Sequence, residues 1–330
     1  MNWSVGGPIG GKILSGFRRR IDGATVVATR RVKEDGDSCG VRRRRAALRL
    51  VDRQLEKSNF KLALSLVKQL QRQPPPAGLR GFAGARQVPR RVLSVQELHL
   101  SVTETSALQS LFDSILDLIM SSLESSPLEE GRSVTSEGDD SYLEDDIIEH
   151  KQVVQHEAGH FLVGYLLGVL PKKYSLFSME DMKQDNIVDA SVKFIGFEFL
   201  TKLEDGVLSK NLQVKPGHQL LCVIVGGLVA EHLVFGYSKG HHADVEMLFV
   251  DNLRRTAFRI VHFIKQLKRV LKQSTEDEAN TLIRWCVLNT LVILHHHGEA
   301  RSMLAEAMAH GRSIGNCIDI IENTLKDQHI

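Results

Sequence analysis

Cysteine is scarce in this chain of 330 residues, and its four cysteines include no CxxC pair of the kind that builds a zinc knuckle. Cys39, Cys222, Cys286 and Cys317 lie far apart, without the density of a secreted, disulfide-rich domain. Long apolar runs are also missing, since the longest, Leu220 to Ala230, is well short of the ~20 residues that span a bilayer. These absences favour a reducing compartment and predict no transmembrane segment, which leaves peripheral membrane association open.

The composition shows no extreme either. Hydrophobic residues make up 42% and charged residues 25% of the chain, with only 8 prolines. These values exclude a collagen-like protein, a coiled-coil rod and a wholly disordered chain. At this length the chain can bury a core and form one large or two modest domains.

The net charge of +2 conceals a strongly basic N-terminal part. Residues 1–91 hold 21 Lys and Arg against 6 acids, and Asp22 is the one acid among the first 33 residues. An Arg-rich, acid-poor N-terminus is typical of an organellar transit peptide, while a nucleic-acid arm and a merely solvated tail are the alternatives. Aromatic residues do not alternate with the basic ones, so we expect no nucleic-acid partner.

The composition and periodicity along the chain predict four segments. Residues 1–45 are expected to be a disordered transit peptide that is dispensable for folding. Residues 46–73 show a helical hairpin pattern, which ends at three prolines that cannot continue a helix. Residues 74–146 are expected to be a linker with one helix and an acidic disordered stretch, since 10 acids stand against one arginine between positions 124 and 149. Residues 147–330 form the main domain.

Apolar periodicity in the main domain is mostly helical, so the predicted fold class is mainly α, with a small β part (α+β). The best strand candidate is the Val- and Phe-containing stretch from Ser191 to Leu200. We expect helices over residues 147–167, 218–235, 244–271, 275–297, 298–310 and 317–325.

The segment His156-Glu157-Ala158-Gly159-His160 carries the clearest chemical pattern. Two histidines four residues apart lie one turn above each other on a helix, where both imidazoles can bind one Zn²⁺ at ~2.0–2.1 Å. Glu157 can then act as general base on the zinc-bound water, whose pKa falls toward ~7. The pattern predicts metal-assisted peptide hydrolysis, against the alternative of a core helix with two satisfied histidines.

Three motifs in the same order resemble the FtsH-type zinc metalloproteases, over about residues 147–260. The segment at 156–160 matches that family's HEAGH, and Gly226 to Gly236 is similar to its GGxxAEExxFG segment. Residues 240–245 resemble its G-A-x-x-D-L segment. The resemblance implies a helical, zincin-like peptidase domain of the FtsH type, with a helical C-terminal extension. It also implies that His156, His160 and Asp244 bind Zn²⁺, that Glu157 is the base, and that Glu231 orients a ligand histidine.

The chain departs from this family at several points. No GxxxxGK[ST] phosphate loop occurs, so the family's AAA ATPase module is missing from the sequence. His232 stands where the family usually has a second Glu, and His241 where it has Ala. The chain most resembles plant FtsH-related proteins that keep HEAGH without the AAA module, which implies a chloroplast location, with the mitochondrion as the alternative.

The residues leave several roles open. Asp244 follows a Gly-His-His loop and could cap a helix instead of binding a metal. Glu231 lies in an apolar helix and needs a partner, either a metal-bound histidine or a base such as Lys239. His241 and His242 are possible substitute ligands, and the three histidines at 295–297 also fit the negative end of a helix dipole.

The leading prediction is a zinc-dependent metalloendopeptidase that hydrolyses unfolded polypeptides in organellar quality control. Its expected partners are polypeptide substrates and FtsH-type AAA protease subunits. The alternative is a catalytically degenerate, FtsH-like interaction subunit of an AAA protease or chaperone complex. The intact HEAGH favours the enzyme, and the missing ATPase favours the scaffold.

Overall fold

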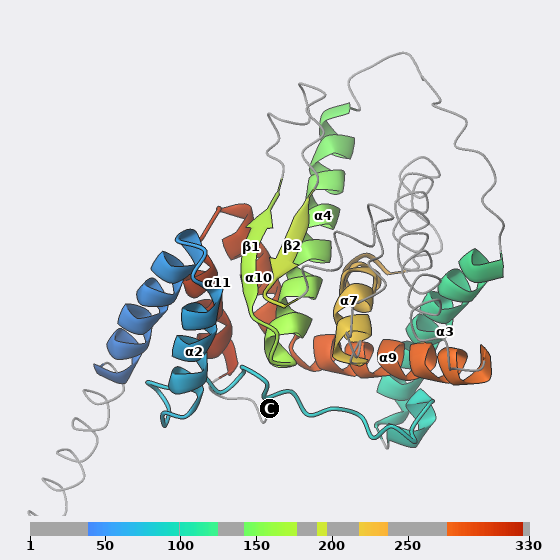
Figure 1. The fold of residues 1–330 in the computed structure, drawn as a ribbon. Helices are drawn as coiled ribbons and strands as arrows, with labels where there is room; N and C mark the ends of the chain where they lie inside the picture. The colour runs from blue at the N-terminus through green and yellow to red at the C-terminus, as the bar shows by residue number, and fades with distance from the viewer. Residues whose placement is uncertain are drawn as a thin grey trace, which may run out of the picture.

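The computed structural model describes residues 39–98, 100–124, 142–176, 190–196, 218–236 and 276–325. This part of the chain is mainly helical, as predicted, with one small two-stranded sheet (Figure 1). The first helix covers residues 39–56 and is called here the 39–56 helix. The elements after it are α2 (Phe60–Gln71), η1 (Val95–Leu98), α3 (Val102–Glu124), α4 (Tyr142–Leu166), β1 (Pro171–Ser175), β2 (Ser191–Phe194), α7 (His218–Phe235), α9 (Glu276–His296), α10 (Gly298–Ala309) and α11 (Ile314–Thr324).

The predicted helical hairpin is present and starts earlier than expected. The 39–56 helix ends in a Schellman motif, in which the Ser58 amide donates to the Leu55 carbonyl and the Asn59 amide to the Gln54 carbonyl. Ser58 takes the left-handed conformation that this motif requires, with φ of +58°. The expectation that residues 1–45 are disordered is therefore wrong for 39–45, because these residues form the first turns of the hairpin.

Residues 74–98, expected to be part of a linker, are packed along the body of the protein. The amides of Ala83 and Ala85 donate to the carbonyls of Tyr165 and Leu166 at the end of α4. Farther on, the Val88 amide donates to Asn289 Oδ1 of α9 at 2.8 Å. One hydrophobic core accordingly contains residues from both sides of the expected boundary at 146, from Leu48 to Leu325.

Helices α4 and α7 form the centre of the molecule and lie side by side, while α9 crosses the end of α7 (Figure 1). Twelve residues of α7 are buried, because the helix packs against α4 on one side and α9 on another. Among the described residues, α7 alone is long and apolar enough to cross a membrane by length and composition, and 67% of it is buried inside the structure. That burial is expected of a core helix.

The small sheet pairs β1 with β2 in antiparallel register beside α4. The predicted strand at 191–200 corresponds to β2, which covers its first four residues. Phe194 of β2 is buried against Gly164 of α4, where an added Cβ would collide with the Phe194 ring. The helix expected over 244–271 lies outside the described residues, as do the sequences at 1–38 and 125–141.

Candidate metal centre

Two glycine contacts set the close approach of α4 and α7 at the HEAGH segment. A Cβ on Gly159 would collide with the carbonyl oxygen of Gly226 and with the Ala230 side chain. A Cβ on Gly227 would collide with the imidazole of His156. The glycine pair that resembles a family motif thus has a physical role in this chain, which is to leave room for the His156 ring between two helices.

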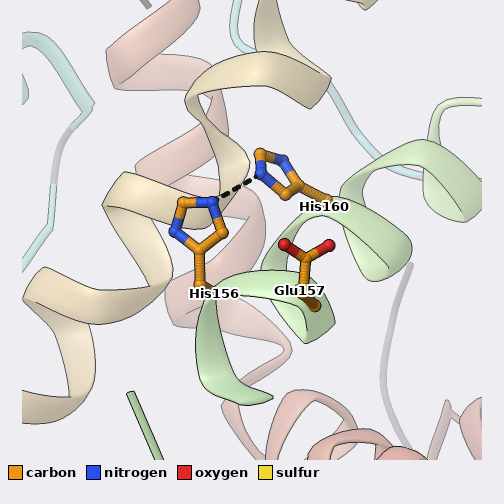
Figure 2. A group of neighbouring side chains, drawn as sticks. All are labelled: His156, Glu157 and His160. Carbon is orange, nitrogen blue, oxygen red and sulfur yellow. Dashed lines mark hydrogen bonds between the residues drawn. The ribbon is translucent and has the colours of Figure 1, made fainter. Parts of the chain in front are cut away.

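The two histidines project from successive turns of α4 and point their Nε2 atoms at each other (Figure 2). The distance between His156 Nε2 and His160 Nε2 is 2.8 Å, and the rings stand nearly perpendicular at 83°. Glu157, from the same turn as His156, is 5% exposed. One ligand atom from each of His156, Glu157 and His160 lies within 4.8 Å of the others.

The other ring nitrogens of both histidines are held by acceptors on α7. Nδ1 of His160 lies 2.6 Å from the carbonyl oxygen of Val223, and Nδ1 of His156 lies 2.5 Å from Oε1 of Glu231. A carbonyl can only accept, so His160 donates its Nδ1 proton, and a carboxylate favours the same arrangement for His156. In neutral rings so arranged, the lone pairs at both Nε2 atoms face the same point.

Electrostatics keeps His160 neutral. Desolvation by burial, followed by repulsion from His156, lowers the pKa of His160 to about 3, against the opposing effect of its bond to Val223. A neutral imidazole is the form that binds a metal. His160 can therefore offer its Nε2 lone pair to a metal at neutral pH without first losing a proton.

Glu231, 2% exposed, is a buried carboxylate whose partners are both on α4. Its Oε1 accepts from His156, and its Oε2 accepts from the side-chain amide of Gln152 at 3.0 Å. The sequence left two kinds of partner open for Glu231, a histidine or a basic residue. The structure pairs it with a histidine, His156. Gln152 was missed, although it stands four residues before His156 and so on the same helical face.

His232 is buried at 1% exposure beside this site on α7. Its Nδ1 donates to the Leu228 carbonyl at 3.0 Å, and burial lowers its pKa. His232 is therefore neutral near pH 7. Asp244, Lys239, His241 and His242 lie outside the described residues, and the structure gives no position for the predicted third ligand. His295 and His296 are exposed at the end of α9, and His297 is buried.

The arrangement can bind a cation between two imidazoles and hold a carboxylate beside it. Nitrogen donors from two histidines fit Zn²⁺, and a carboxylate partner on the remote nitrogen of a ligand histidine is the usual way of orienting such a ring. No protein-family model, curated protein or solved structure matches the chain.

Proposed function

We propose that the protein is a zinc-dependent metalloendopeptidase whose metal is held by His156 and His160. The observation that carries this proposal is the convergence of two Nε2 atoms at 2.8 Å while both Nδ1 atoms are committed to acceptors. Facing lone pairs repel each other, and a cation between them removes the repulsion. Asp244 is the proposed third ligand, on the ground of the motif resemblance alone.

When bound, Zn²⁺ supplies the Lewis acidity that allows water to attack a peptide carbonyl near neutral pH. The chain's own residues then have three tasks. Glu157 takes the proton of the attacking water on its carboxylate and passes it to the leaving amine. Glu231 holds the His156 ring through Nδ1, and the Val223 carbonyl holds the His160 ring in the same way. Organellar polypeptides are the proposed substrates, with the chloroplast as the proposed location.

The test measures metal content and proteolysis on the same purified full-length chain. We expect zinc to co-purify and the protein to cleave casein, and we expect a chelator to abolish the cleavage. Glu157→Gln should keep its zinc and lose about 10²–10⁴-fold in turnover, because the amide cannot accept the water's proton. Glu299→Gln is the matched control, since this exposed glutamate of α10 lies outside the site.

Two results would contradict the proposal at different steps. Absence of zinc from a folded wild-type chain would leave a hydrogen bond between the two Nε2 atoms as the arrangement in the site. Full zinc occupancy without any cleavage would contradict the proposed peptidase activity and favour the alternative, a non-catalytic, FtsH-like interaction subunit.

A further inference from the structure

A groove of about 760 Å³ lies along β1, on a part of the molecule that the proposed catalysis does not use. Its walls are β1, the turn between α10 and α11, and the turn of the N-terminal hairpin around Ser58. His150 of α4 also lines it, but this residue and His156 are about 120° apart around the helix, since they are separated by six positions. The groove and the metal centre are therefore separate sites.

The shape of the groove fits an extended chain. All five residues from 172 to 176 line it, whereas Lys193 is its single lining residue from β2. Successive residues of a strand point to opposite faces of the sheet, so a groove touched by five residues in a row follows β1 along its length and does not cross it. An occupant of this groove follows the strand direction.

Among the described residues, the charged side chains that line the groove are mostly positive. Lys172, Lys173, Lys193 and Arg312 line it, against Asp52 and Glu56. Asp52 is already engaged at the start of α11, where Oδ1 accepts from the Gly315 amide at 2.6 Å and Oδ2 from the Ser313 hydroxyl at 2.8 Å. Glu56 is the other acid among the described residues of the lining, so four cations stand against two carboxylates and this part of the lining carries an excess of positive charge.

Two of these cations are placed at a cost to stability. Lys173 and Lys193 are direct partners in the register of β1 and β2, and like charges in opposite positions of an antiparallel pair destabilise a sheet. Both side chains are exposed. An anionic group bound between them would relieve the repulsion, so the pair is itself an observation that points to a negatively charged ligand.

The floor of the groove is apolar. Leu55, Phe60, Met308 and Ile314 contribute to it, and Lys172 Nζ lies 5.1 Å from the centre of the Phe60 ring. A free anion or a nucleotide phosphate would use the lysines but make no apolar contact with these side chains. A polypeptide with both carboxylates and apolar side chains uses both features.

We propose that this groove binds an extended acidic segment of a second protein, with its carboxylates on Lys173, Lys193 and Arg312 and its apolar side chains on the floor. The concave shape favours a peptide over a membrane surface, which is flat on this scale. The proposal does not depend on zinc or on hydrolysis.

The experiment uses the full-length chain and a short fluorescein-labelled peptide rich in glutamate with a few leucines, followed by fluorescence anisotropy. A peptide with glutamine in place of glutamate is the ligand control. Lys193→Glu should weaken binding about tenfold, because it removes one attraction and adds one repulsion. The same variant should raise the melting temperature, because it converts a like-charge pair into an opposite-charge pair. Lys68→Glu, an equal change of charge at an exposed site of α2, should alter affinity less than about twofold.

Opposite effects on binding and stability from one substitution are the signature of a binding site. The proposal is overturned if the peptide does not bind the wild-type chain, or if Lys68→Glu weakens binding as much as Lys193→Glu. It is also overturned if binding appears only after neutralisation of Glu129, Glu130, Glu137, Asp139 and Asp140, which would assign the groove to this chain's own acidic segment. Lys193-dependent binding to phosphatidylserine vesicles without peptide binding would assign it to a membrane.

Discussion

Three side chains one helical turn apart on α4 meet a single carboxylate and a single carbonyl of α7. Gln152, His156 and His160 stand at intervals of four residues, and the first two converge on Glu231. A carboxylate with such low exposure needs compensation for lost hydration, and two hydrogen-bond donors supply it. The position of the His156 ring is therefore set by a residue 75 positions away in the sequence.

Removal of the Glu231 carboxylate tests this dependence. Glu231→Ala should lower zinc affinity about 10–100-fold, because the His156 ring loses the acceptor that fixes its tautomer and orientation. Glu231→Gln should lose less, since an amide oxygen can still accept the Nδ1 proton. Competition with a chromophoric chelator measures both affinities, and circular dichroism checks the fold of each variant.

The matched control is Glu306→Gln, at an exposed position of α10. Wild-type zinc affinity in Glu231→Ala would show that this carboxylate only satisfies Gln152 and has no part in the metal centre.

The sequence could predict His156, Glu157 and His160 because their spacing alone places them together on one helix. It could also single out Glu231 as a charge in an apolar helix that requires a partner. It could not identify the Val223 carbonyl, because every residue has such a group and only the packing of α7 on α4 selects this one. The same packing was needed to explain Gly159, for which the sequence indicates only an energetic cost within a helix.

At the scale of elements, the packing of α4 on α7 is closer than side chains of ordinary size allow. Gly159 and Gly226 face each other: a Cβ on Gly159 would collide with the Gly226 carbonyl oxygen, and a Cβ on Gly226 would lie 3.1 Å from the Gly159 carbonyl oxygen. This contact brings Val223 and Glu231 within hydrogen-bond distance of the two histidines. The separation of the two helices and the geometry of the metal centre are therefore linked.

Gly159→Ala tests this link. We expect a net loss in the free energy of unfolding, because overpacking against Gly226 and Ala230 costs about 1–3 kcal/mol. This exceeds the ~1 kcal/mol that alanine gains over glycine within a helix. Urea unfolding of the metal-free protein measures the effect. Gly298→Ala in α10 is the control, since no atom lies within 4 Å of its added Cβ, and it should be neutral or stabilising. A stabilised Gly159→Ala would disprove the close contact.

Within the part of the chain that the structure describes, the sequence predicted the long helices well and the short strand β1 not at all. α7 covers the expected residues 218–235, because its apolar run and the following glycine mark both ends. β1, with the sequence Pro-Lys-Lys-Tyr-Ser, has no alternating apolar pattern and becomes a strand only by pairing with β2. Strands of this kind depend on tertiary context more than on local preference.

At the scale of the whole molecule, a buried polar network at α11 joins segments of the chain that are distant in sequence. Tyr165 of α4 donates to Glu322 of α11 at 2.6 Å, and the Gly81 amide donates to the same carboxylate at 2.7 Å. Burial is the main cause that raises the pKa of Glu322, while these hydrogen bonds oppose the rise. Three parts of the chain that are distant in sequence thus meet at α11.

This long-range assembly could not be predicted from the sequence. The arginines at 42–45 read as part of a basic N-terminal segment, since nothing local distinguishes Arg44 from its neighbours. Only the folded chain places Arg44 at 1% exposure beside Asp319, which is 275 residues away. A charged residue contributes to the fold when it is buried with a specific partner, and the composition of a segment does not identify that partner.

Two adjacent arginines that bind the same carboxylate allow a matched test of this network. The Arg44 and Arg45 side chains are 2% and 54% exposed, and both contact Asp319 at 2.7 Å. Arg44→Met should lower the free energy of unfolding by about 3 kcal/mol, because it removes a buried partner of Asp319. The loss falls at the low end of the range for a broken buried pair, since Arg45 still compensates Asp319. Arg45→Met should cost less than ~1 kcal/mol, as exposed ion pairs do.

Denaturant unfolding measures both variants, and a chain that begins at residue 46, which lacks both arginines, should lose at least as much stability as Arg44→Met. Equal small losses in the two point variants would show that the hairpin is not held to α11 by this pair.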